Sequence, residues 1–214
     1  GSSSSCWACT AYTSGSRIYC HSVIEEYILD LSFLVSYQDG HKHLLSNEYE
    51  RQLAVAKQEP NGPQPVVQDR GRQKRIMGDN PSWWVGKPKK GNNTSMHAFG
   101  PTRTVVDNVI GLLPTLPENE TKFFSWLRFD STLNLHKDPD SECWIAFNVR
   151  GDQSIYFNTD DGEFAGSIKY NVALVNSKKY HAFETDGNER LLLRKTFKHH
   201  TFDQMKSYLN ERLT

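Results

Sequence analysis

The sequence predicts a mainly β protein with flanking helices, built as a jelly-roll or related double-sheet barrel. Between residues 122 and 197, short segments alternate apolar and polar side chains and are separated by turn signals, a pattern typical of half-buried strands. Helical patterns stand before these segments, over residues 22–35, and after them, over residues 201–213. Many short strands at close spacing between helices favour two sheets packed on one another.

The balance of charge limits the classes of partner. The chain has 214 residues, with 25 Lys and Arg against 25 Asp and Glu, so its formal net charge is zero. A neutral chain has no general electrostatic attraction to nucleic acid or to an anionic membrane surface. No apolar run approaches the roughly 20 residues that span a bilayer, and the first residues lack the basic and apolar regions of a secretory signal. We therefore expect a cytoplasmic protein, and we expect neither a membrane nor nucleic acid as a partner.

Residues 1–58 are predicted to form a helical N-terminal segment. Apolar side chains over residues 22–35 follow one helical stripe, and Ser22 with Glu25 makes a capping box at its start. A second helix is predicted from about residue 47 to residue 57, because a similar capping pair precedes another apolar pattern there.

Residues 59–76 have the composition of a linker, with three prolines, two glycines and a basic cluster. We interpret the basic cluster as a solvated charge run; a tether for nucleic acid is the alternative. No methionine precedes Met77, and the composition changes there. Residues 77–214 are therefore predicted to be the barrel domain, and the segment before them is alternatively an appendage to it.

Three cysteines crowd the N-terminus, where Cys6 and Cys9 have the spacing of half a zinc site. Cys20 and His21, the remaining candidates, are adjacent in the sequence, which is poor spacing for two ligands of one ion. An incidental cluster is the favoured interpretation, with zinc binding as the alternative.

The barrel domain is predicted to begin with a short helix within residues 102–116, which Pro114 stops. Period-two alternation then predicts strands that continue to residue 197. These strands lie within residues 122–130, 131–138, 143–151, 153–162, 166–176 and 180–197.

Turn and capping signals predict how some of these elements connect. Residues 143–151 and 153–162 are expected to pair as a hairpin, and the Asp-Gly pair within residues 185–188 supplies the positive φ angles of a tight hairpin turn. The C-terminal helix is expected to be capped by Thr201, with Gln204 completing a capping box.

The end of the second strand carries the first candidate for chemistry. Residues two apart on a strand point to the same face, so His136 and Asp138 lie side by side, and Pro139 ends the strand. His181 begins another alternating segment. Two histidines and one carboxylate, with further positions open, are the ligand set of non-haem Fe(II) oxygenases. A solvated polar turn is the alternative for the first pair.

An arginine follows the second histidine at a suitable distance. Arg190 stands nine residues after His181, and it shares its face of the strand with Arg194, whereas Leu191 and Leu193 face away. Either arginine can point into a barrel interior and hold a carboxylate in a planar, two-pronged pair.

The combination of His136-Lys137-Asp138, His181 and Arg190 resembles the Fe(II)/2-oxoglutarate-dependent dioxygenases, and the spacing from His181 to Arg190 is similar to that of their prolyl and aspartyl/asparaginyl hydroxylase branch. The resemblance covers roughly residues 96–197.

This resemblance implies a double-stranded β-helix, a cupin-like jelly roll, in which His136, Asp138 and His181 hold Fe(II). It implies that 2-oxoglutarate binds the iron and pairs its far carboxylate with Arg190. Two tyrosines, Tyr156 and Tyr170, are candidates for a second hydrogen bond to 2-oxoglutarate, and core packing is the alternative for both. The implied reaction uses dioxygen, releases succinate and CO2, and hydroxylates a protein side chain or a small molecule.

A second class of function stays open on the same residues. A non-enzymatic, metal-binding jelly-roll or cupin-like module would use the two histidines and the aspartate without an oxygenase reaction. Arg190 separates the two interpretations, because a barrel that only binds a metal has no need of an inward arginine at that position. The primary substrate is not readable, although a peptide or a small molecule is easier to accommodate than duplex DNA.

Overall fold

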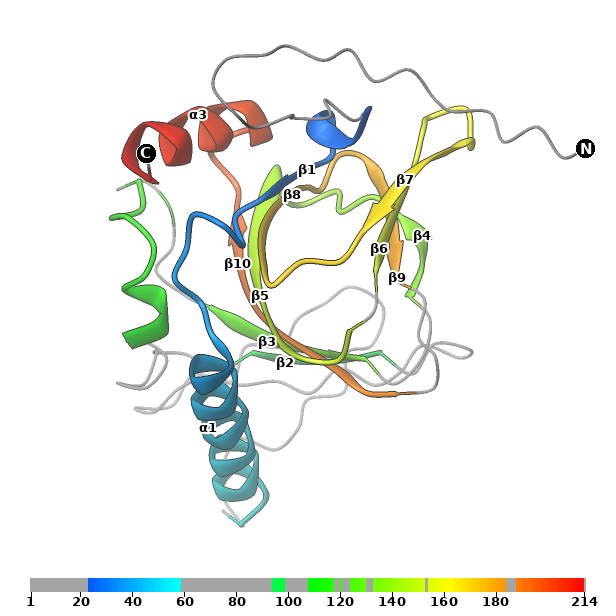
Figure 1. The fold of residues 1–214 in the computed structure, drawn as a ribbon. Coiled ribbons are helices and arrows are strands. Elements are labelled where there is room, and N and C mark those ends of the chain that lie inside the picture. The colour runs from blue at the N-terminus through cyan, green and yellow to red at the C-terminus, as the bar shows by residue number, and fades with distance from the viewer. Residues whose placement is uncertain are drawn as a thin grey trace, which may run out of the picture.

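Two antiparallel sheets make up the body of the protein in a computed structural model (Figure 1), which confirms the predicted mainly β, double-sheet fold. The structure describes residues 23–58, 94–98, 108–117, 120, 124–129, 133–152, 154–183 and 188–213. The larger sheet runs in the order β1 (Ile28–Asp30), β8 (Val172–Asn176), β5 (Cys143–Arg150), β10 (Arg190–Phe197), β3 (Ser125–Phe129) and β2 (Thr94–Ala98). The smaller sheet runs in the order β4 (Leu133–His136), β9 (Tyr180–Phe183), β6 (Ile155–Asn158) and β7 (Phe164–Ile168).

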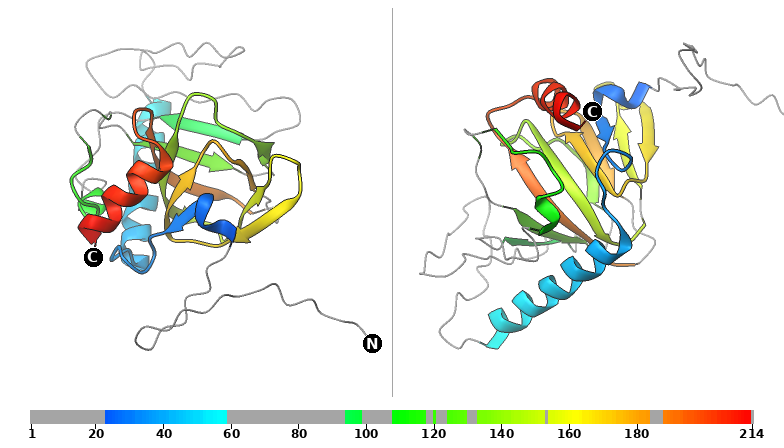
Figure 2. Two further views of the ribbon diagram at one scale, coloured as in Figure 1. Left: turned by 90° about the horizontal axis from the view of Figure 1, so that it is seen from above. Right: turned by 60° about the vertical axis from the view of Figure 1, so that its left-hand side comes forward.

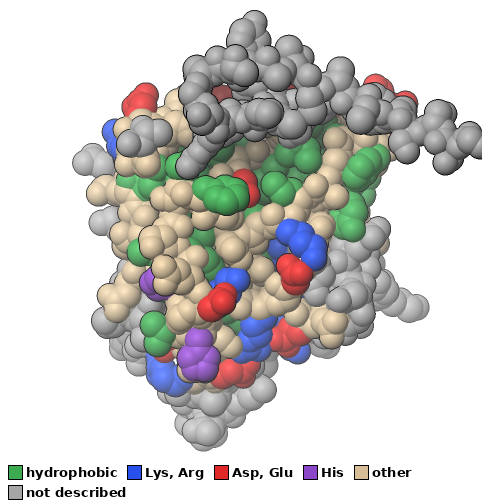
Figure 3. Space-filling view, in the orientation of Figure 1, with side chains coloured by type: hydrophobic (Ala, Val, Ile, Leu, Met, Phe, Trp, Pro, Cys, Tyr) green, Lys and Arg blue, Asp and Glu red, His purple; other side chains and the backbone are tan. Residues whose placement is uncertain are grey.

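Helices cover the outer side of the larger sheet, as Figure 2 shows for α1 (Asp39–Gln58) and α3 (Phe202–Leu213). A short 3-10 helix, η1 (Val23–Glu26), precedes β1. No helix in the described ranges is both long and apolar enough to cross a membrane. Acidic and basic side chains lie beside one another on the face in Figure 3, in keeping with a net charge of zero.

The larger sheet is buried on both faces, which gives the protein two apolar cores. The helix-facing core joins the outer face of this sheet to the helices, and it includes Leu45, Tyr49, Ile145, Phe147, Leu191, Leu193, Met205 and Leu209. The interior core lies between the two sheets and includes Leu127, Trp144, Ile155, Phe157, Phe183 and Leu192. Because side chains alternate along a strand, β1, β8, β5, β10 and β3 each contribute to both cores in turn.

β10 shows this alternation most clearly. Leu191 and Leu193 belong to the helix-facing core, whereas Leu192 belongs to the interior core. Arg190 and Arg194 stand two residues on either side of Leu192 and therefore share its interior face. The prediction that Leu191 and Leu193 face away from Arg190 and Arg194 is confirmed.

The helix predicted over residues 22–35 is wrong. This segment forms η1, then β1, and then a turn. Its apolar residues are spaced like a helix but serve two cores, because Ile28 enters the interior core and Leu31 and Val35 enter the helix-facing core. The Leu31 N–H donates to the Val172 carbonyl at 2.8 Å, so the segment is bonded to the larger sheet.

The second predicted helix begins eight residues earlier than expected. α1 starts at Asp39, where the backbone N–H of Gln38 donates to Nδ1 of His41 at 3.0 Å. A histidine ring in this role is not among the usual cap residues, so the start signal was missed. Leu45 and Tyr49 of α1 pack into the helix-facing core. The predicted linker, residues 59–76, lies outside the described residues.

Neither of the two expected hairpins forms, because in each case the two strands belong to different sheets. β5 pairs with β8 and β10 in the larger sheet, whereas the next strand, β6, pairs with β7 and β9 in the smaller one. Gly151, with φ of 85°, turns the chain from one sheet toward the other. β9 and β10 also belong to different sheets, and the turn residues 184–187 lie outside the described part of the chain.

The C-terminal helix is confirmed, including its cap. The backbone N–H of Gln204 donates to the Thr201 hydroxyl at 3.3 Å, and the Thr201 N–H donates to the Gln204 side-chain oxygen at 2.9 Å. This reciprocal pair satisfies two donors at the start of α3.

Candidate metal centre

Two histidines face each other across neighbouring strands of the smaller sheet. His136 is the last residue of β4 and lies directly opposite His181 of β9 in the antiparallel register. Their ring centroids are 4.4 Å apart. Phe183, two residues after His181, belongs to the interior core, and His181 itself is 1% exposed. The strand pairing therefore brings together two imidazoles that are 45 residues apart in the sequence.

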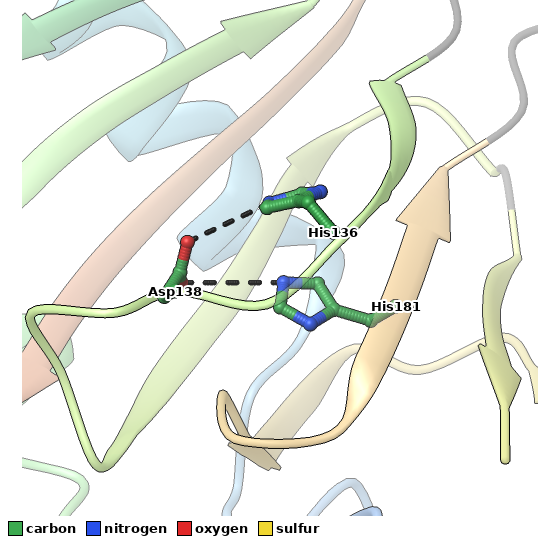
Figure 4. Close-up of side chains that lie close together, drawn as sticks. All are labelled: His136, Asp138 and His181. Carbon is green, nitrogen blue, oxygen red and sulfur yellow. Dashed lines mark ion pairs between the residues drawn. The ribbon is translucent and has the colours of Figure 1, made fainter. Parts of the chain in front are cut away.

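Asp138 completes the group, as Figure 4 shows. Its backbone N–H donates to the Ser177 carbonyl at 3.0 Å, which holds the turn after β4 in place. Its Oδ1 lies 3.5 Å from Nε2 of His136, and its Oδ2 lies 4.0 Å from Nε2 of His181. One ligand atom from each of the three residues lies within 4.8 Å of the other two. The structure thus places the three predicted ligands around one point.

Both histidines are held in the tautomer that a metal requires. Nδ1 of His136 is 2.7 Å from the Asn134 carbonyl, and Nδ1 of His181 is 2.9 Å from the Lys179 carbonyl. A carbonyl oxygen only accepts, so each Nδ1 carries the proton and donates. In the neutral ring Nε2 then has the free lone pair, and on both rings Nε2 is the nitrogen on the side of Asp138.

Burial and mutual contacts set the charges of the group. Burial, with the neighbouring His136, lowers the pKa of His181 to about 4. Burial acts to raise the pKa of Asp138, but the hydrogen bond with His136 and the charge of Arg194 outweigh it, and the pKa falls to about 2. For His136 burial lowers the pKa, yet its contacts with Asp138 raise it above the ordinary value overall. At neutral pH the group therefore includes an ionised carboxylate and a neutral His181, the forms that bind a metal.

An arginine and a tryptophan border the three residues on the side of the larger sheet. Nη1 of Arg194 lies 3.7 Å from Oδ2 of Asp138, and the guanidinium carbon lies 5.8 Å from the centroid of the Trp144 ring. The same ring is 5.9 Å from the ring of His181. The sequence predicted that Arg194 could face the interior, but it did not identify Trp144. The alternation of side chains along β5, which places Trp144 on the interior face, is the signal that could have identified it.

Arg190 lies elsewhere in the interior and is fully buried. Its guanidinium carbon is 4.6 Å from the ring centroid of Phe183 and 5.3 Å from that of Tyr170. Tyr170 is buried beside it, and burial raises the pKa of its hydroxyl. Tyr156 is placed differently, because its neighbours along β6 face the interior, and its ring lies 6.5 Å from that of Phe164 on β7. Of the two candidate tyrosines, the structure brings only Tyr170 near Arg190.

Comparison with solved structures gives neighbours of low similarity. A Pseudomonas putida prolyl-4-hydroxylase has 11% identity and a TM-score of 0.45, over 80% of this chain and 92% of that one. An oxidoreductase of the 2OG-Fe(II) oxygenase family from Burkholderia pseudomallei has 12% identity and a TM-score of 0.39, over 72% of this chain and 80% of that one. The Drosophila melanogaster CENP-C cupin domain has 6% identity and a TM-score of 0.35, over 70% of this chain and 97% of that one.

Neither family models nor curated protein sequences give a match. These neighbours include oxygenases and a cupin domain, and all three have TM-scores below 0.5.

Proposed function

We propose that the protein is an Fe(II)- and 2-oxoglutarate-dependent dioxygenase that hydroxylates a protein side chain or a small molecule, with succinate and CO2 as co-products. The observation that carries the proposal is the convergence of His136, Asp138 and His181 on one point of a barrel whose interior also holds the buried guanidinium of Arg190.

The three ligand residues fit Fe(II). Two imidazole nitrogens and one carboxylate suit a borderline divalent metal, and three protein ligands leave coordination positions open. The hydrogen bonds at each Nδ1 orient both rings with Nε2 toward Asp138, and His136 gives up the Nε2 proton that it shares with Asp138 when a metal binds. When bound, Fe(II) would supply the coordination of 2-oxoglutarate and the oxidative chemistry with dioxygen.

Arg190 fits the far carboxylate of 2-oxoglutarate. A guanidinium pairs with a carboxylate through two parallel hydrogen bonds, and this pairing is strongest where water is excluded. Arg190 faces the interior from β10, and the aromatic rings of Phe183 and Tyr170 pack beside its guanidinium. The Tyr170 hydroxyl is the proposed second partner of the same carboxylate. Tyr156 is not part of the proposal, because it lies on the other face of its strand.

The interior core has a part in the proposed reaction. Its apolar side chains surround the buried His181 and Arg190, and Trp144 and Phe183 are each 1% exposed. A dry interior strengthens the pairing of Arg190 with a carboxylate and shields reactive species from side reactions.

Turnover of 2-oxoglutarate tests this proposal against a metal-binding module without enzymatic activity. Protein supplied with Fe(II), ascorbate and 2-oxoglutarate in air is expected to form succinate slowly even without a primary substrate. His136→Ala removes a ligand and is expected to abolish succinate formation, whereas His199→Ala, at an exposed histidine before α3, is the matched control and should retain it. Metal binding without succinate formation in any of these proteins would favour the binding module.

A further inference from the structure

Arg194 is a second guanidinium in the barrel interior with surroundings of its own. Its side chain is 16% exposed, and within the described residues Asp138 is the carboxylate that lies within 4.0 Å of it. Its Nε is buried and has no hydrogen-bond partner in the described part of the structure. Arg194 therefore has capacity for a further acceptor beyond Asp138.

Trp144 offers a second donor beside Arg194. The indole ring is 1% exposed and lies next to both Arg194 and His181. Its Nε1 is also buried without a hydrogen-bond partner among the described residues. Buried donors are normally satisfied, so two of them side by side indicate an acceptor that arrives with a ligand.

The two arginines of β10 have different nearest neighbours. Arg190 and Arg194 are four residues apart on the same face, which places their Cα atoms roughly 13 Å from each other. Arg190 packs against Phe183 and Tyr170, whereas Arg194 packs against Trp144 and Asp138.

The charges of the site with metal and 2-oxoglutarate bound also favour an acidic group as the ligand of Arg194. Fe(II), Arg190 and Arg194 would together carry four positive charges. Asp138 and the two carboxylates of 2-oxoglutarate would supply three negative charges. Arg194 would then share the carboxylate of Asp138 with the metal, so an acidic group is a suitable acceptor for its remaining donors.

We propose that Arg194, with the indole N–H of Trp144, forms a subsite beside the metal ligands that binds an acidic group of the primary substrate. The substrate is then an anion, such as an organic acid or an acidic side chain, and its negative charge selects it. This inference rests on the proposed function, because the positive charge to be matched includes that of the metal.

The test uses protein loaded with Mn(II) and 2-oxoglutarate, and methanesulfonate as the probe anion. Methanesulfonate coordinates metals poorly, and its methyl protons relax faster when they are held near Mn(II). We expect saturable relaxation enhancement in the wild type, and little with dimethyl sulfone, the neutral counterpart. Arg194→Gln is expected to weaken probe binding about tenfold or more, because hydrogen bonds to a charged group are lost. Trp144→Phe is expected to weaken it less, and Arg212→Gln, on the surface of α3, should leave it unchanged.

Separate titrations with Mn(II) and with 2-oxoglutarate distinguish the outcomes that would contradict the proposed subsite from those that would contradict the proposed function. Unchanged relaxation in Arg194→Gln would overturn the subsite. A loss of 2-oxoglutarate affinity in that variant would assign Arg194 to the co-substrate and would also overturn it. A loss of Mn(II) affinity would reduce Arg194 to a residue that positions Asp138. Failure of the wild type to bind Mn(II) or 2-oxoglutarate would instead contradict the proposed function.

Discussion

Among single residues, Arg190 distinguishes the proposed oxygenase from a protein that only binds a metal. It is fully buried on the interior face of β10, and burial lowers the pKa of its guanidinium below the ordinary value. An arginine nevertheless stays protonated in proteins, so a positive charge is fixed in the interior.

Arg190→Gln is therefore expected to raise the Kd of 2-oxoglutarate by about 100-fold or more, because two charge-assisted hydrogen bonds contribute about 1.5–3 kcal/mol each. Calorimetry on Mn(II)-loaded protein measures this, with Mn(II) affinity as the internal control. An unchanged Kd would mean that the far carboxylate binds elsewhere.

Sequence patterns predicted which face of a strand a residue occupies better than they predicted the contacts between sheets. Period-two alternation places His136 and Asp138 on one face and Arg190 on the inner face of its strand, because those relations are local. The contacts of Arg194 with Asp138, and of Trp144 with His181, join different sheets. No local pattern encodes such contacts, since they depend on how the two sheets face each other.

Among the contacts between elements, those of Glu120 stabilise the junction between β10 and α3. Its carboxylate accepts the backbone N–H groups of Lys198 at 3.1 Å and His199 at 2.8 Å, and lies 2.9 Å from Nδ1 of His200. Burial acts to raise the pKa of Glu120, but these hydrogen bonds outweigh it and lower the pKa.

A lowered pKa makes this contribution to stability depend on pH. The stabilisation is fully present above the ordinary glutamate pKa and is lost as the pH falls through the lowered value. Glu120→Gln is expected to reduce the free energy of unfolding at pH 7 by about 1.5–3 kcal/mol, the range for hydrogen bonds to a charged group. Urea denaturation at several pH values should show the difference from wild type shrinking in acid. A difference that grows in acid would contradict the assignment.

Leu193 tests the helix-facing core, because it is 1% exposed between the sheet and the helices. Leu193→Ala is expected to lower the free energy of unfolding by about 2–5 kcal/mol through lost burial and the cavity left behind. Leu44→Ala on α1 is the matched control, since Leu44 is 48% exposed, and its effect should stay within about 0.5 kcal/mol. Equal effects of the two substitutions would mean that the core is placed wrongly.

The element with the strongest local signal, α3, was predicted correctly, whereas the segment over residues 22–35 was not. The capping box at Thr201 and Gln204 identifies α3 from the sequence. The stripe over residues 22–35 resembles a helix, yet it is divided between two cores by pairing with β8. Tertiary pairing overrides a local period when it buries the same apolar residues and satisfies the backbone.

Metal binding should stabilise the whole molecule, because the ligands come from β4, β9 and the turn that joins β4 to β5. At a free metal concentration 100-fold above Kd, the expected gain is about 2.7 kcal/mol, or roughly 5–10 °C in Tm for a chain of this size. Thermal unfolding with Mn(II) and with EDTA measures it. His136→Ala should show no gain; a gain of the same size in that variant would place the metal elsewhere.

The sequence predicted the double-sheet fold of the whole molecule, but it did not predict which strands belong to which sheet. Short alternating strands between helices predicted two packed sheets, as observed. Strands adjacent in the sequence were expected to pair, but β5 and β6, and also β9 and β10, cross between sheets. Alternation determines which face of a strand is buried and carries no information on which strand lies beside it.

The central claim is that one site holds Fe(II) and 2-oxoglutarate together, and an anaerobic titration tests it most directly. Metal-free protein receives Fe(II) and then 2-oxoglutarate, while the visible metal-to-ligand charge-transfer band is recorded. We predict a band in the wild type, no band in His136→Ala, and a band in Arg190→Gln that requires far more 2-oxoglutarate. Bound Fe(II) without a band at any 2-oxoglutarate concentration would contradict the claim and leave a metal-binding barrel of another kind.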